Sequence, residues 1–411
     1  MNIIGGVIWH YWLAVPLVVV GVVSLIAALI GYLGKVSSTR YPKRLLPGIP
    51  VERYQASSVE GMTVDWGLAE KVANQIANRA PFNDVSYLKG LNESFSGFTS
   101  TAEKLVETST GLKSFSGEAR AKVVDRSGWI RANFSSLKRL LKPVMAEDSE
   151  MKKASISSRV AALEIGAVLG WMSTRVLGQY DLLVLDNEDL KDQDLVYYVG
   201  PNICAIERRY AFDPDGFRLW LAIHELTHRA QFTGVSWMRE HYLSLVKNLL
   251  QEVQIVTDES EEKNNSQIKL LKDPGSSRLT EFKMSNFFTA MDQKDSVKEI
   301  AALMTLLEGH GDVIMSRAGK GHVKNQKRFE KVVSQRRKSA SGATKIFQKI
   351  IGIEAKLAQY EQGEEFIYAI EELEGMDFLN MVWEHPDNLP KLEEIKDPNL
   401  WIARIKRLSN E

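Results

Sequence analysis

The stretch PDGFRLWLAIHELTHRAQFTG, residues 214–234, contains the pattern His-Glu-Leu-Thr-His between His224 and His228. Pro214 suits the first turn of a helix and Gly234 suits its end, so the stretch predicts a helix over residues 214–233. Residues four apart lie on one face of a helix, and the two histidines can therefore present imidazole nitrogens to one metal ion. The alternative is a pair of histidines on an ordinary helix face.

Glu225 follows the first of these histidines, close to the metal position but poorly placed to bind the ion itself. Zinc lowers the pKa of a bound water towards neutrality and polarises a carbonyl group. A neighbouring carboxylate can take the proton of that water and pass it to the leaving group. The pattern therefore predicts zinc-assisted hydrolysis with Glu225 as the general base.

A catalytic zinc site needs a third protein ligand and one open position. The chain has a single cysteine, Cys204, so the ligands must be histidines and carboxylates. The extended pattern HExxHxxGxxH is absent, because Gln231 and Gly234 stand where its glycine and third histidine would be. The third ligand must therefore come from another part of the chain.

The segment LLEGHGD, residues 306–312, lies on a helix predicted over residues 297–317 and offers this ligand. Glu308 is the preferred candidate. Asp312 lies four residues later on the same face and can accept a hydrogen bond from the N–H of a ligand imidazole. His310 and Asp312 remain alternative ligands, because the flanking glycines can distort the turn. His310 is also a candidate hydrogen-bond donor to an oxyanion.

Residues 12–34 are an uncharged, apolar segment of 23 residues, and a helix needs about 20 to cross the hydrocarbon core of a membrane. They predict one transmembrane helix, between an N-terminal stub (1–11) and a proline-containing tether (35–61). Four basic residues follow the segment closely and none precedes it, so the positive-inside rule predicts a single-pass protein with a cytoplasmic catalytic region. The alternative, a cleaved signal peptide, lacks a basic leading region and a clear cleavage site.

Helical patterns dominate the rest of the chain. Further helices are predicted over residues 66–78, 101–108, 117–141, 157–178, 235–254 and 277–291. Two short apolar runs, at 182–185 and 195–199, predict a small two-stranded β element. We expect a mainly α protein with an N-terminal helical layer (62–150) and a region holding the metal site (151–411).

The charge of the chain gives no evidence for a polyanionic partner, because 52 basic residues balance 52 acidic ones. Residues 319–349 are an exception, with ten basic residues against one acidic residue, Glu330. Nucleic-acid binding is one interpretation of this run. We favour a solvated helix and loop lying near anionic lipid heads, and expect no nucleic-acid partner.

Strings between Val64 and Arg407 carry a family resemblance: VDWGLAEKVA from Val64, VVDRSGWIRAN from Val123, LGWMSTRVLGQYD from Leu169, YVGPNICAIER from Tyr198, FRLWLAIHELTHRAQF from Phe217, LLEGHGDVIM from Leu306, GIEAKLAQYEQGEEF from Gly352 and LPKLEEIKDPNLWIARI from Leu389. They resemble a bacterial, mainly actinobacterial family of zincin-like hydrolases, labelled zinc-dependent metalloproteases or proteins associated with deazaflavin cofactor biosynthesis. The resemblance implies a mostly helical zincin fold, two histidine ligands at 224 and 228, and Glu225 as the base. The membrane helix departs from typical members.

Two functions follow from these patterns. The first is a membrane-tethered zinc peptidase that acts on peptides or proteins at the cytoplasmic face. The second is a zinc-stabilised helical scaffold without turnover, since a metal-binding pattern alone does not establish catalysis.

Overall fold

The computed structural model describes residues 64–82, 88–141, 156–182, 194–252, 294–338 and 353–409. The predicted stub, membrane segment and tether (1–61) and the helix expected over 277–291 lie outside these residues. Within the described residues, no helix has the length and apolar character needed to cross a membrane.

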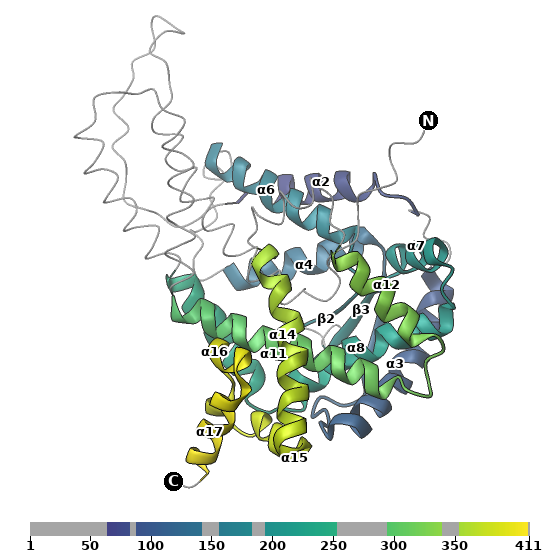
Figure 1. The fold of residues 1–411 in the computed structure, drawn as a ribbon. Coiled ribbons are helices and arrows are strands. Elements are labelled where there is room, and N and C mark those ends of the chain that lie inside the picture. The colour runs from purple at the N-terminus through teal and green to yellow at the C-terminus, as the bar shows by residue number, and fades with distance from the viewer. Residues whose placement is uncertain are drawn as a thin grey trace, which may run out of the picture.

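A three-stranded sheet occupies the middle of the described structure (Figure 1). Its order is β1 (Arg120–Val124), β3 (Leu195–Val199) and β2 (Gly178–Tyr180), with β1 parallel and β2 antiparallel to β3. The central strand β3 is buried along its whole length, as expected for the apolar run LVYYV. The prediction of a strand at 195–199 is confirmed. The other predicted strand, 182–185, lies outside the described residues except for Leu182, which is not in a strand, and the prediction of a two-stranded element is wrong because the described residues form three strands.

The additional strands replace parts of two predicted helices. The helix expected over 117–141 is confined to α4 (Arg126–Leu141), because residues 120–124 pair with β3 instead. Asp125 separates the two elements, and its Oδ1 accepts a 2.6 Å hydrogen bond from the N–H of Gly128, a capping contact that favours a helix start here. The helix expected over 157–178 is α6 (Ile156–Ser173), which ends before β2 begins.

The helices pack in two groups around this sheet (Figure 1). The first group consists of α2 (Trp66–Ala77), α4 and α6, which pack against one another. The second group is α3 (Leu88–Thr110), α8 (Pro214–Thr233), α11 (Asp295–Ala318) and α14 (Ile353–Glu374). In it α8 packs against α3, α11 and β2, so the helix with the histidine pattern is a core element.

Shorter elements complete the described fold: α7 (Gly200–Tyr210), a helix at 238–252, α12 (Gln326–Lys338), α15 (Met376–Asn380), the 3-10 helices η3 (Met381–Trp383) and η4 (Pro386–Asn388), α16 (Leu392–Lys396) and α17 (Pro398–Leu408). The basic run contributes α12, whose described lysines Lys327 and Lys331 are exposed.

Helices α11 and α14 cross where two glycines meet. A Cβ atom on Gly309 would overlap the backbone of Gly363 and Glu364, and one on Gly363 would overlap the carbonyl oxygen of Thr305. The two backbones can approach this closely only because neither glycine has a side chain. The crossing therefore holds the part of α11 that carries Glu308 against its neighbour.

We expect Gly309→Ala to lower the free energy of unfolding by about 1–3 kcal/mol, because the added methyl group must push α14 away. Urea unfolding followed by circular dichroism measures this change. Gly97→Ala in α3 is the matched control, since a Cβ there meets nothing within 4 Å. It should raise stability by about 0.5–1 kcal/mol through helix propensity. Equal responses of the two variants would contradict the close crossing.

Candidate metal centre

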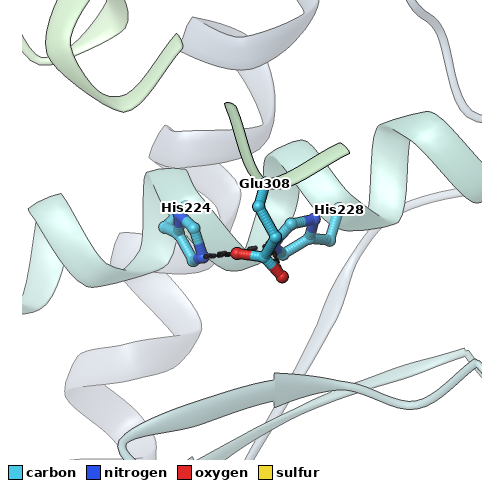
Figure 2. A group of neighbouring side chains, drawn as sticks. All are labelled: His224, His228 and Glu308. Atoms are coloured by element: carbon cyan, nitrogen blue, oxygen red, sulfur yellow. Dashed lines mark hydrogen bonds and ion pairs between the residues drawn. The ribbon is translucent and has the colours of Figure 1, made fainter. Parts of the chain in front are cut away.

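Three side chains converge between α8 and α11 (Figure 2). The Nε2 atoms of His224 and His228 lie 3.0 Å apart. The carboxylate oxygens of Glu308 lie 3.7 Å from Nε2 of His228 and 4.0 Å from Nε2 of His224. One ligand atom from each residue lies within 4.8 Å of the other two, and all three residues are buried.

This group suits a zinc ion. Two imidazole nitrogens and a glutamate oxygen form one of the ligand sets that catalytic zinc sites use, with the fourth position open. Tetrahedral zinc with bonds of about 2.0–2.2 Å separates neighbouring ligand atoms by about 3.3–3.6 Å. The two imidazole nitrogens, 3.0 Å apart, are slightly closer than that range, and Glu308 places one oxygen 3.7 Å from His228 and the other 4.0 Å from His224, slightly beyond it. Small adjustments of the side chains would bring both nitrogens and one carboxylate oxygen onto one ion.

The helix that carries the two histidines begins where the sequence predicts. Pro214 occupies the first turn, and Asp213 caps the helix by accepting a 2.9 Å hydrogen bond from the N–H of Gly216. On the opposite helix, Gly311 faces the histidines. A Cβ there would lie 3.1 Å from Cε1 of His224, so glycine at this position lets α11 approach the imidazole closely.

Gln231, one turn later on α8, contacts the ring nitrogen of His228 that points away from the other two candidate ligands. This nitrogen, Nδ1, lies 3.0 Å from Oε1 of Gln231. Burial lowers the pKa of His228, and the hydrogen bond with Gln231 and the charge of Asp312 partly offset this effect. The neutral imidazole is the form that binds a metal ion.

Glu225 is buried and lies against the edge strand β2. A Cβ on Gly178 would fall 2.5 Å from Oε1 of Glu225, so the carboxylate rests directly on this glycine. Burial raises the pKa of Glu225 to about 8, while a hydrogen bond from the backbone N–H of Tyr180 lowers it. A cation in the neighbouring site would favour the charged carboxylate.

The other two candidates on α11 lie outside the three-residue group. Asp312 is half-buried, and its charge raises the pKa of His228. His310 is buried; its Nδ1 lies 2.9 Å from Nε2 of Gln231, and its ring packs edge-on against Trp383. This geometry gives no support to the expected hydrogen bond from His310 to an oxyanion. Asp312 is the predicted hydrogen-bond acceptor for the N–H of a ligand imidazole. At His228 the amide oxygen of Gln231 holds this position instead.

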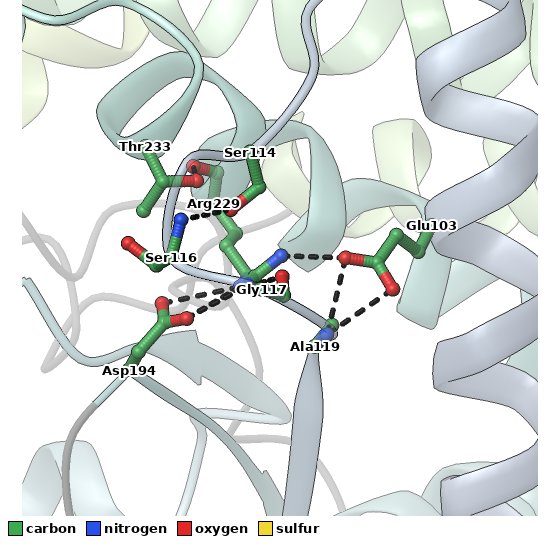
Figure 3. Close-up of polar contacts among 8 residues, drawn as sticks. All are labelled: Glu103, Ser114, Ser116, Gly117, Ala119, Asp194, Arg229 and Thr233. Atoms are coloured by element: carbon green, nitrogen blue, oxygen red, sulfur yellow. Dashed lines mark hydrogen bonds and ion pairs between the residues drawn. The ribbon is translucent and has the colours of Figure 1, made fainter. Parts of the chain in front are cut away.

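An ionic cluster around the buried Arg229 lies next to the site in sequence, and the sequence analysis missed it (Figure 3). Arg229 follows the second histidine, and its side chain is 1% exposed. Its guanidinium donates hydrogen bonds to Asp194 (2.5 Å), Glu103 (2.6 Å) and the carbonyl oxygen of Gly117 (2.8 Å). The hydroxyl of Tyr180 also bonds Asp194. Gly117, Tyr180 and Asp194 lie at or near the ends of the three strands, and Glu103 lies on α3. The cluster therefore ties the sheet and α3 to α8.

Comparisons with known proteins relate the chain to a metallopeptidase family and to a solved structure. A family model described as zincin-like metallopeptidase matches residues 64–402. A solved structure from Chloroflexus aurantiacus, described as "a putative hydrolase with a novel fold", is similar to this chain with a TM-score of 0.60. The two chains are 28% identical, and the alignment covers 84% of this chain and 99% of the other. No curated protein matches the chain.

Proposed function

Because the chain belongs to the zincin-like metallopeptidase family, we propose that it is a zinc-dependent hydrolase that cleaves an amide bond in peptides or proteins. In this proposal His224, His228 and Glu308 hold the zinc ion. The observation that carries the proposal is the convergence of these three buried residues within 4.8 Å. His224 and His228 lie on α8, the helix that also carries Glu225, and Glu308 reaches them from α11.

Each residue of the site has a defined part in such a reaction. Zinc, when bound, supplies a Lewis acid that polarises the scissile carbonyl and makes water a better nucleophile. Glu225 takes a proton from the attacking water and delivers it to the leaving nitrogen. The backbone N–H of Tyr180 orients the Glu225 carboxylate. Asp312 adds negative charge behind His228, which favours the positively charged metal centre.

The substrate class of the proposal rests on family membership. Family membership supports a peptide, and the Chloroflexus protein is described only as a hydrolase. Neither comparison specifies a side-chain preference. We therefore propose amide hydrolysis as the reaction and a peptide as the substrate class.

Removal of the metal provides the test of this function. The purified full chain should contain one zinc per molecule and cleave members of a broad peptide library. We expect a chelator to abolish cleavage, and stoichiometric zinc to restore it, because the three protein ligands alone supply no Lewis acid. Metal analysis and mass spectrometry of the library provide the two readouts.

The alternative function, a zinc-stabilised helical scaffold, makes a different prediction in the same experiment. Zinc would bind stoichiometrically and chelation would lower thermal stability, but no peptide would be cleaved. A chain that binds no zinc contradicts both functions.

We also propose that residues 12–34 anchor the protein in a membrane with the catalytic region in the cytoplasm. The support is the 23-residue uncharged segment and the basic residues that follow it. Single cysteines at position 6 or position 39, in a Cys204→Ser background, can be labelled in intact cells with a membrane-impermeant reagent. Labelling at position 6 alone is expected, and labelling at position 39 alone contradicts the orientation.

A further inference from the structure

Gln231 is a fully buried glutamine with 0% exposure, three residues after His228 on α8. Its amide makes three polar contacts. Oε1 lies 3.0 Å from Nδ1 of His228. Nε2 lies 3.0 Å from the carbonyl oxygen of Leu307 and 2.9 Å from Nδ1 of His310. The amide thus lies between the histidine ligands of α8 and the helix that carries Glu308.

These contacts determine which way the amide points. The carbonyl oxygen of Leu307 can only accept a hydrogen bond, so the group that faces it must be the NH2 of Gln231. The oxygen of the amide must then face His228. A flipped amide would set its oxygen against the Leu307 carbonyl, which places two acceptors together without a hydrogen.

The same contacts determine the tautomer of His228. The amide oxygen of Gln231 can only accept, so Nδ1 of His228 must carry the hydrogen and donate it. Its Nε2 is then left with a lone pair, on the side that faces His224 and Glu308. That lone pair is what a metal ion needs from a neutral imidazole.

We infer that Gln231 is a positioning residue of the metal centre, which orients His228 as a ligand and ties the Glu308 segment of α11 to α8. The inference rests on the proposed metal site and deepens it. Leu307 directly precedes Glu308, so the bond from Gln231 to its carbonyl sets the separation of the two helices at the third ligand. His310 serves as the second acceptor on α11, and Gln231 therefore contacts this helix at two points around Glu308.

A purely apolar side chain of similar length cannot take over this role. Methionine at position 231 would fill the space but leave the N–H of His228 and the Leu307 carbonyl without their present partner. Glutamate would keep an acceptor for His228 but lose the donor to Leu307 and His310. The two variants therefore separate the two halves of the inference.

The test compares Gln231→Met and Gln231→Glu with a matched control, Gln326→Met. Gln326 also donates its amide to an α11 carbonyl, that of Ser316 at 2.7 Å, and it donates to the carboxylate of Glu330, which is not one of the proposed metal ligands. The readouts are the zinc dissociation constant by chelator competition, the visible spectrum of the cobalt-substituted full chain, and the tautomer of His228 by 15N-histidine NMR of the metal-free protein.

We expect Gln231→Met to weaken zinc binding about 10- to 100-fold, the effect typical of removing an outer partner of a ligand. It should also change the cobalt spectrum and mix the His228 tautomers. Gln231→Glu should keep the Nδ1–H tautomer but still weaken zinc binding, and it decides the question if the methionine variant does not fold. Gln326→Met should leave all three readouts unchanged.

The inference would be overturned if both Gln231 variants kept the zinc affinity, the cobalt spectrum and the His228 tautomer of the wild-type protein. Failure of the wild-type protein to bind zinc would instead overturn the proposed function. The two failures can be told apart because the NMR measurement of the tautomer needs no metal.

Discussion

Glu225→Gln is expected to slow peptide hydrolysis by about 10²- to 10⁴-fold, the range typical of losing a general base. Glutamine has nearly the same shape and can still occupy the space against Gly178, but it cannot take a proton from water. Zinc binding should be unchanged, because Glu225 is not among the three convergent ligands. Single-turnover rates on a cleaved library peptide, together with zinc analysis of the same sample, measure both quantities.

Glu299→Gln on α11 is the control for this variant, because it makes the same chemical change at an exposed position. It should leave the rate and the zinc content as in the wild-type protein. Glu225→Gln with an unchanged rate would show that another group accepts the proton. A loss of zinc in Glu225→Gln would show that this residue is a ligand.

Arg229→Met is expected to lower the free energy of unfolding by about 2–4 kcal/mol, below the full cost of breaking a buried ion pair because the carboxylates left behind are 23% and 14% exposed. The substitution leaves the carboxylates of Glu103 and Asp194 without the guanidinium that now bonds both. It also releases the Gly117 carbonyl, so α8 loses two contacts beside the sheet, at Gly117 and Asp194, and one on α3, at Glu103. Urea denaturation measures the change.

The comparison for this effect is Lys298→Met, which removes an exposed ion pair. Lys298 and Asp295 are 49% and 87% exposed, and such pairs contribute about 0–1 kcal/mol. The two variants should therefore differ several-fold in their effect. Similar small losses in both would mean that the Arg229 cluster contributes little to holding the sheet on α8.

The helix and ligand candidates were predictable because their signals are local. The boundaries 214–233 follow from Pro214 and Gly234, and the observed α8 has the same bounds. Glu308 is preferred from the sequence because a glutamate on a later helix is a common third zinc ligand, and Asp312 follows it by four residues, on the same helix face. The structure brings this glutamate, and neither His310 nor Asp312, into the group with the two histidines.

The parts that were not predictable depend on contacts between distant segments. Strand β1 contains helix-compatible residues, and its parallel pairing with β3 joins residues 75 apart, Arg120 and Leu195. Arg229 meets Glu103 across 126 residues and Asp194 across 35, while a charged residue on a helix is usually exposed. For Gln231 the sequence shows only its position, three residues after His228 on the same predicted helix. Its hydrogen bonds to Leu307 and His310 could not be predicted, because they depend on how α8 packs against α11.

The most direct test of the account is a crystal of the full chain with diffraction data collected above and below the zinc absorption edge. The account predicts a zinc anomalous peak within about 2.0–2.2 Å of Nε2 of His224, Nε2 of His228 and one carboxylate oxygen of Glu308. A zinc-loaded crystal with its peak elsewhere, or with Glu308 outside bonding distance, would contradict it.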